Sequence, residues 1–204
     1  MDLEKRAYDY DTRVKTISDC SYQEKIQEIY IRNTKGLDLE DSHIIGMISL
    51  SAVTEEGNNM QTGYSHYIFK ELSEEYKEKL IKDSVGDAIA MLGAESIKSG
   101  NYEIILRSNV AADMFSYFSP IFLGSTVQKN LSLMKGKLDS KVAVDFFNIV
   151  EDPLMENGKH FRTFDDEGTV AYSKNIIENG ILKTFLHNNK TAEKHGSKST
   201  GNGF

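Results

Sequence analysis

The sequence predicts an α+β fold: an antiparallel β-meander with a packed helix, followed by a second α+β unit with a mixed sheet. Three observations predict it. Residues 12–70 form runs of apolar and alternating residues that are separated by short turns. Residues 73–93 then repeat apolar residues about every 3.6 positions, which is typical of a helix. Further along the chain, Asn179-Gly180 separates two strand-like runs, as in a tight hairpin.

The first unit is expected to contain consecutive strands. Apolar residues cluster at positions 29–31, alternate with serines at 48–52 and resume at 64–69. Turn signals lie between these runs, at Asn33–Gly36 and at Glu55–Asn59. Because short connections join neighbouring strands in opposite directions, the runs favour an antiparallel meander.

A helix is expected after this meander. Ser73 is a suitable N-cap, and the two glutamates that follow it suit the positive end of the helix dipole. Gly93 can end the helix in the left-handed conformation. We place the domain boundary after this helix, which gives one domain of residues 1–99 and a second of residues 100–204. The apolar stripe that would cover the sheet consists of Tyr76, Leu80, Ile81, Val85, Ala88, Ile89 and Leu92.

The second unit is expected to mix strands and helices. Asn109 could cap a helix that Ser119-Pro120 kinks or ends, since proline removes a backbone donor. Asn179-Gly180 suits a type I′ turn, which needs positive φ at both positions. Gly196 can stop a short helix that begins near Asn189. The predicted strands are Tyr102–Arg107, one within 144–153, Val170–Glu178 and Ile181–His187.

Composition and charge exclude several classes of function. The formal net charge is -7, and no run of basic residues offers a surface for phosphates, so we expect no nucleic-acid partner. No apolar run approaches the ~20 residues of a membrane span, and the N-terminal residues do not resemble a signal peptide. Cys20 is the only cysteine, so no intrachain disulfide can form. These features predict a cytoplasmic protein with no membrane association.

The acidic run in TFDDEGT leaves three interpretations open. It could be a loop in which aspartates accept backbone N–H bonds and Gly168 takes positive φ. It could face a substrate, or it could hold a catalytic or metal-binding cluster. Asp165 and Asp166 point to opposite sides of an extended chain and cannot share a site without a bend, and Glu167 completes no EF-hand pattern.

Other candidate chemical groups have little support from their neighbours. The histidines form no H-E-x-x-H motif and no tight pair, so we interpret them as surface or strand residues without a metal. Cys20 has no neighbouring group that would activate it, which favours a structural role. The STGNG stretch lacks the lysine of a P-loop, and no G-x-S-x-G elbow is present. The histidines are His43, His66, His160, His187 and His195.

An ordered set of motifs resembles the TldD/PmbA family. The DDEG loop, IENGILK, TAEKHG and STGNG occur at spacings similar to the family's core signature. Two upstream segments resemble further parts of the same family. The strand-then-helix segment of the family resembles SGNYEIILRSNVAADMF, and one of its hairpins resembles RNTKGLDLEDS. The resemblance covers residues 10–204. It implies that 1–99 is a middle domain and that 100–204 begins the C-terminal domain of a longer protein.

The resemblance also implies which branch of the family is closer. The TldD branch carries H-E-x-x-x-H on the helix after the first strand of the C-terminal domain and is regarded as a metalloprotease. The PmbA branch, also called TldE, lacks that motif and pairs with TldD. Here Phe115–Ile121 contains neither histidine nor glutamate, and phenylalanine, serine and tyrosine cannot replace zinc ligands and a general base. No catalytic residue, metal ligand or cofactor is therefore expected in this chain, and zinc only in a TldD-type partner.

The function implied by the resemblance is that of a non-catalytic subunit in a metalloprotease complex that processes or degrades unfolded peptides. Its partner would be a TldD-like subunit in a heterodimer, or a second copy of itself. An older label describes the family as modulators of DNA gyrase. The alternative is a stand-alone peptide-binding or regulatory protein without protease activity. The residues expected to line a peptide groove are Asp165, Asp166, Glu167, Gly168, Thr200, Gly201 and Asn202.

Overall fold

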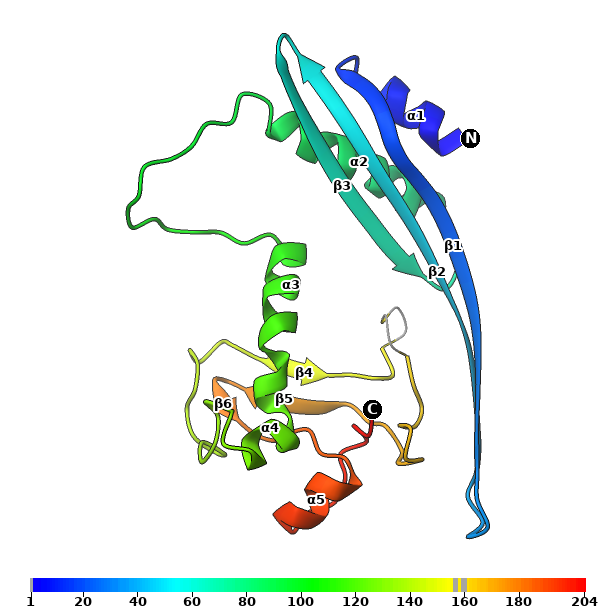
Figure 1. Ribbon diagram of the computed structural model, residues 1–204, viewed down its shortest axis with the longest axis vertical. Helices are drawn as coiled ribbons and strands as arrows, with labels where there is room; N and C mark the ends of the chain where they lie inside the picture. Colours follow the sequence, from blue (N-terminus) through cyan, green and yellow to red (C-terminus); the bar gives the residue numbers. More distant parts are fainter. Residues whose placement is uncertain (1, 156–157, 159–160) are drawn as a thin grey trace. The chain divides into compact units, whose positions relative to one another are not determined.

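The computed structural model describes residues 2–155, 158 and 161–204, and these divide into two compact units (Figure 1). Unit 1 holds the residues up to Glu28 together with Ser42–Gly100. Unit 2 holds Ile29–Asp41 and Asn101–Phe204. The chain therefore crosses between the two units more than once, because the segment Ile29–Asp41 separates the two parts of unit 1 in the sequence and belongs to unit 2. None of the helices in the described part of the chain is long and apolar enough to cross a membrane.

Unit 1 is built on a three-stranded sheet in the order β1-β2-β3. β2 and β3 pair antiparallel without a register shift, from Gly46 opposite Phe69 to Glu56 opposite Asn59. The predicted meander is therefore confirmed. A helix at the N-terminal end, which the sequence analysis did not predict, adds to this unit. The elements are α1 (Asp2–Tyr10), β1 (Val14–Arg32), β2 (Asp38–Glu56), β3 (Asn59–Phe69) and α2 (Glu74–Ala90).

The core of unit 1 forms between the sheet and α2. Side chains along a strand alternate between the two faces of the sheet. On one face of β2, side chains such as Ile48 and Leu50 pack against apolar residues of α2. The side chain of Ser73 accepts the backbone N–H of Tyr76 at 3.4 Å, so the predicted N-cap is confirmed. The helix ends at Ala90, before the glycine that was expected to close it. The buried apolar residues are Ala7, Ile48, Leu50, Ala52, Phe69, Leu80, Ile81 and Val85.

Gly63 on β3 allows the sheet and α2 to approach closely. A Cβ atom there would lie 2.0 Å from the carbonyl oxygen of Ser84 and 2.5 Å from the backbone nitrogen of Ala88. Because both are backbone atoms, Gly63→Ala must push the helix away, and we expect it to destabilise unit 1 by about 2–3 kcal/mol. Gly86→Ala is the matched control. It meets nothing within 4 Å, and in chemical denaturation it should instead stabilise by about 0.5–1 kcal/mol. Equal effects of the two changes would contradict this packing.

Unit 2 contains a second sheet in the order β4-β5-β6. Phe122, Ile176 and Leu182 are among the buried residues of its core. Asn179 (φ 50°) and Gly180 (φ 77°) both have positive φ and join β5 to β6, so the hairpin turn is confirmed. The elements are α3 (Ser108–Phe118), a 3-10 helix η1 (Ser119–Phe122), α4 (Gly124–Gln128), β4 (Ile149–Glu151), β5 (Lys174–Glu178), β6 (Ile181–Leu182) and α5 (Asn189–His195).

The structure differs from the expectations for unit 2 in four places, and the first is that β5 and β6 are shorter than the predicted strands Val170–Glu178 and Ile181–His187. Residues 102–107 form no strand, and Ile105 is 98% exposed, because no strand in the described part of the chain pairs with this run. The described strands pair only antiparallel, and the expected parallel pairing is limited to one isolated bridge between Leu123 and Leu186. α3 begins at Ser108 with no side-chain cap, so Asn109 is not its N-cap.

Candidate functional site

Asp165 is the centre of the acidic loop, and its carboxylate is fully used by the backbone. The side chain is 1% exposed. One oxygen accepts N–H bonds from Glu167 (3.0 Å) and Thr169 (2.8 Å), and the other accepts one from Gly203 (2.8 Å). Such bonds satisfy a buried charge that would otherwise be costly. Asp165 therefore shapes the loop and joins it to the glycine-rich segment.

The other residues of this loop serve separate contacts. Asp166 is 62% exposed and pairs with Arg162 at 2.9 Å. Glu167 accepts the backbone N–H of Asn189 at 2.7 Å, in the first turn of α5. Gly168 has φ +77°, and a Cβ there would lie 2.6 Å from a methyl group of Leu37. The three acids therefore do not converge, and the structural interpretation of the loop has the strongest geometric support.

The loop is bound to the start of β2 by a residue that the sequence analysis did not single out. The carboxylate of Asp41 accepts two hydrogen bonds from Thr163, from its backbone N–H at 3.0 Å and from its hydroxyl at 2.9 Å. The two residues are 122 positions apart, and no local pattern in the sequence points to this pair.

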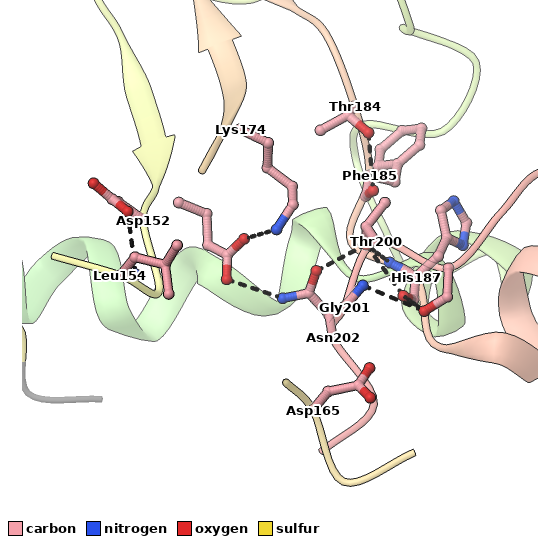
Figure 2. Close-up of polar contacts among 12 residues, drawn as sticks. Asp152, Leu154, Asp165, Lys174, Thr184, Phe185, His187, Thr200, Gly201 and Asn202 are labelled. Atoms are coloured by element: carbon pink, nitrogen blue, oxygen red, sulfur yellow. Dashed lines mark hydrogen bonds and ion pairs between the residues drawn. The ribbon is translucent and has the colours of Figure 1, made fainter. Parts of the chain in front are cut away.

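Thr200, Gly201 and Asn202 form a second part of the site (Figure 2). The hydroxyl oxygen of Thr200 accepts the backbone N–H of His187 at 2.6 Å and lies 2.8 Å from the side-chain oxygen of Asn202. The amide of Asn202 donates to Glu151 at 3.1 Å. Gly201 has φ +73°, and a Cβ there would lie 2.8 Å from the carbonyl oxygen of Val170. Only glycine suits this position.

A half-buried ion pair completes the network. The ammonium group of Lys174 pairs with the oxygen of Glu151 that Asn202 does not use. The side chains of Lys174 and Glu151 are only 7% and 22% exposed. Lys174 also lies 4.4 Å from the ring centre of Tyr172. A polar chain therefore runs from β5 through β4 to the glycine-rich segment, as the dashed lines of Figure 2 show.

His187 corrects the interpretation of the histidines as surface or strand residues. It follows β6 and is 4% exposed, and its Nδ1 lies 3.2 Å from the hydroxyl of Thr191. Its ring stacks on His195 with 4.9 Å between the ring centres. Burial, and next the neighbouring His195, lower the pKa of His187. His160 lies outside the described residues.

The lowered pKa of His187 predicts a loss of stability in acid. The unfolded chain takes up a proton on this histidine near its ordinary pKa of about 6.5, whereas the folded chain resists it to lower pH. The free energy of unfolding should therefore fall as the pH drops below about 6.5, and His187→Gln should make this fall shallower. NMR titration of the imidazole protons of His187 measures its pKa directly. A midpoint for His187 above 6.5 would contradict the prediction.

The two motifs singled out from the sequence do meet. Asp165 accepts from Gly203, and the backbone N–H of Asp166 donates to the carbonyl of Gly203 at 3.0 Å. A Cβ at Gly203 would come within 2.7 Å of the side chain of Glu167. The DDEG loop and the STGNG segment are therefore one structural unit. Whether its surface binds a peptide stays a prediction.

The side chains of α3 do not fit a zinc site. The helix carries no histidine, cysteine or glutamate, and Asp113 is its one carboxylate. Across residues 2–155, 158 and 161–204, no group of three or more His, Cys, Asp or Glu side chains is arranged to hold a metal ion. A zinc site needs three or four convergent ligands, so we derive no chemical step through a metal in this chain.

Two family models together span almost the whole chain. One, described as the PmbA/TldA metallopeptidase central domain, matches residues 1–92, and the other, described as the C-terminal domain, matches residues 99–204. The chain belongs to the PmbA/TldD family. The resemblance stated from the motifs is therefore confirmed, and so is the α+β fold that it implies.

Individual proteins of the PmbA/TldD family share about a quarter of their residues with this chain. A metalloprotease of Methanocaldococcus jannaschii is 28% identical over 95% of this chain and 43% of its own length. A homologue of metalloprotease PmbA from Buchnera aphidicola is 24% identical over 98% of this chain and 45% of its own length. The chain thus spans less than half the length of these relatives.

Two solved structures have the same fold. A protein of Thermotoga maritima, described as a candidate modulator of a DNA gyrase, superposes with a TM-score of 0.92 at 35% identity, over 100% of this chain and 48% of that one. TldE from Thermococcus kodakarensis superposes with a TM-score of 0.84 at 22% identity, over 98% and 46% of the two chains. The second similarity concerns the fold alone.

Proposed function

We propose that this chain is part of a non-catalytic, PmbA/TldE-like subunit of a TldD-type metalloprotease complex that processes or degrades unfolded peptides. The observation that carries the proposal is the composition of α3, which has neither histidine nor glutamate where the TldD branch carries its zinc motif. Zinc and the general base would then come from a TldD-like partner in a heterodimer. This chain would act in the cytoplasm and contribute the subunit interface and part of the peptide-binding wall.

The joined DDEG and STGNG segments support the second half of this proposal. The buried carboxylate of Asp165 accepts the backbone N–H of Gly203 and so joins the two segments, whereas the buried hydroxyl of Thr200 binds the STGNG segment to the backbone of His187. The carboxylate of Asp166 is exposed beside them. We assign Asp165, Gly168, Thr200 and Gly201 to the scaffold of a groove, and Asp166 to its surface. An extended peptide could bind such a wall through its main chain.

Co-elution and peptide digestion test the proposal together. The full-length protein alone should leave an unfolded peptide uncut, and should co-elute with a TldD-like subunit and raise cleavage by that subunit. Co-elution with no effect on cleavage would contradict a role in the protease. Peptide binding without any association would favour the stand-alone regulatory protein instead.

A single substitution tests the groove. Asp166→Ala should lower partner-dependent cleavage several-fold without lowering stability, because the carboxylate is exposed and its loss uncovers no buried group. Asp145→Ala is the matched control, since that carboxylate is 82% exposed and also pairs with a basic residue four positions away. Equal cleavage by both variants and the unchanged protein would remove Asp166 from the groove.

A further inference from the structure

A pocket of about 330 Å³ lies between α4 and α5 of unit 2, and none of the residues of the proposed groove lines it. Three lysines line it: Lys129, Lys190 and Lys194. Its other lining residues are all polar and uncharged. The volume is at the lower end of the range for small-ligand sites. The three lysines favour an anionic ligand over a cation.

The three ammonium groups are not neutralised within the described part of the chain. None of them forms an ion pair there, whereas the ammonium groups of Lys77, Lys79 and Lys141 do. Lys190 and Lys194 are four positions apart on one face of α5, where like charges repel and destabilise a helix. The chain as a whole carries a formal net charge of -7, so this cluster is a local exception that a bound anion would stabilise.

The wall of the pocket is held in place by hydrogen bonds. The side-chain amide of Gln128 on α4 donates to the carbonyl of Thr191 on α5 at 2.7 Å. Asn188 and Thr191 form a reciprocal capping box at the start of α5. The lysines therefore extend from a fixed frame, which lowers the entropic cost of closing around a ligand.

We propose that this pocket binds an oxyanion, the phosphate or carboxylate group of a small ligand or peptide, through Lys129, Lys190 and Lys194. The chemistry common to both sources is a compact negative charge with several acceptor oxygens, which ammonium groups bind well. The proposal does not depend on the role of the chain in a protease complex.

NMR titration of the protein tests the site with two separate probes, inorganic phosphate and a tetraglutamate peptide. At least one probe should produce saturable shifts of the backbone amides of α4 and α5, and added sodium chloride should weaken the binding. The double variant Lys190→Gln/Lys194→Gln should bind about tenfold more weakly, or worse, at the same salt concentration. Lys183→Gln, an exposed lysine of the same unit outside the pocket, is the control and should bind as the unchanged protein does.

The pattern of results separates the two sources. Binding of phosphate alone assigns the site to a phosphorylated ligand, and binding of the peptide alone assigns it to carboxylates. Absence of saturable shifts with both probes, or equal affinity of the double variant and the control, would overturn the proposal. Thermal melting of each variant confirms that it is folded, since exposed lysines contribute little to stability.

Discussion

Asp165→Ala should destabilise unit 2 by about 3 kcal/mol or more. The change removes a buried carboxylate that accepts the N–H groups of Glu167, Thr169 and Gly203, and it leaves those donors without their partner. In a unit of this size, the loss corresponds to a fall of roughly 12 °C in the melting temperature. Chemical denaturation followed by circular dichroism measures it.

The neighbouring acid provides the control for this prediction. Asp166→Ala removes an exposed carboxylate with a single ion pair to Arg162, so it should change the stability by less than about 1 kcal/mol. If Asp165→Ala were equally mild, the carboxylate would not hold the loop, and Asp165 would return as a candidate for binding or catalysis.

Lys174→Met should also destabilise unit 2, by about 2 kcal/mol, because it leaves the half-buried charge of Glu151 without its partner. The double variant Lys174→Met/Glu151→Gln should recover more than half of this loss. Glutamine removes the unpaired charge and can still accept the hydrogen bond from Asn202. The free energies of unfolding of the single and double variants measure the difference.

Lys183→Met is the control for the ion pair, since this lysine is exposed and its substitution should alter stability by no more than about 0.5 kcal/mol. A double variant less stable than Lys174→Met alone would show that the contribution of Glu151 does not depend on its partner. The network of Figure 2 would then not act as one unit.

Local patterns predicted much of the fold. Alternation along β2, the cap at Ser73 and the turn at Asn179-Gly180 each depend on residues close together in the sequence, and the structure confirms them. Two features escaped this reasoning. α1 has only nine residues, and only Leu3 and Ala7 of it contact the core of unit 1, so its apolar stripe is too short to recognise. The run from Tyr102 to Arg107 has strand-like residues but no strand beside it.

The candidate site was predictable only in part. The sequence analysis offered a backbone-binding role for Asp165 as one of three interpretations, and its hydrogen bonds now favour that one. The contacts of Asp41 with Thr163 and of Glu151 with Asn202 span 122 and 51 residues. Contacts between residues so far apart in the sequence depend on the tertiary fold, and no local sequence pattern predicts them. The burial of His187 has the same origin, since residues of α4, α5 and the glycine-rich segment enclose it.

The metal content of the full-length protein, measured by mass spectrometry after purification with and without a TldD-like partner, tests the central claim most directly. We predict that the isolated protein contains no stoichiometric zinc, and that zinc in the complex belongs to the partner. One tightly bound transition-metal ion per chain, held by side chains of this polypeptide, would contradict the assignment as a non-catalytic subunit.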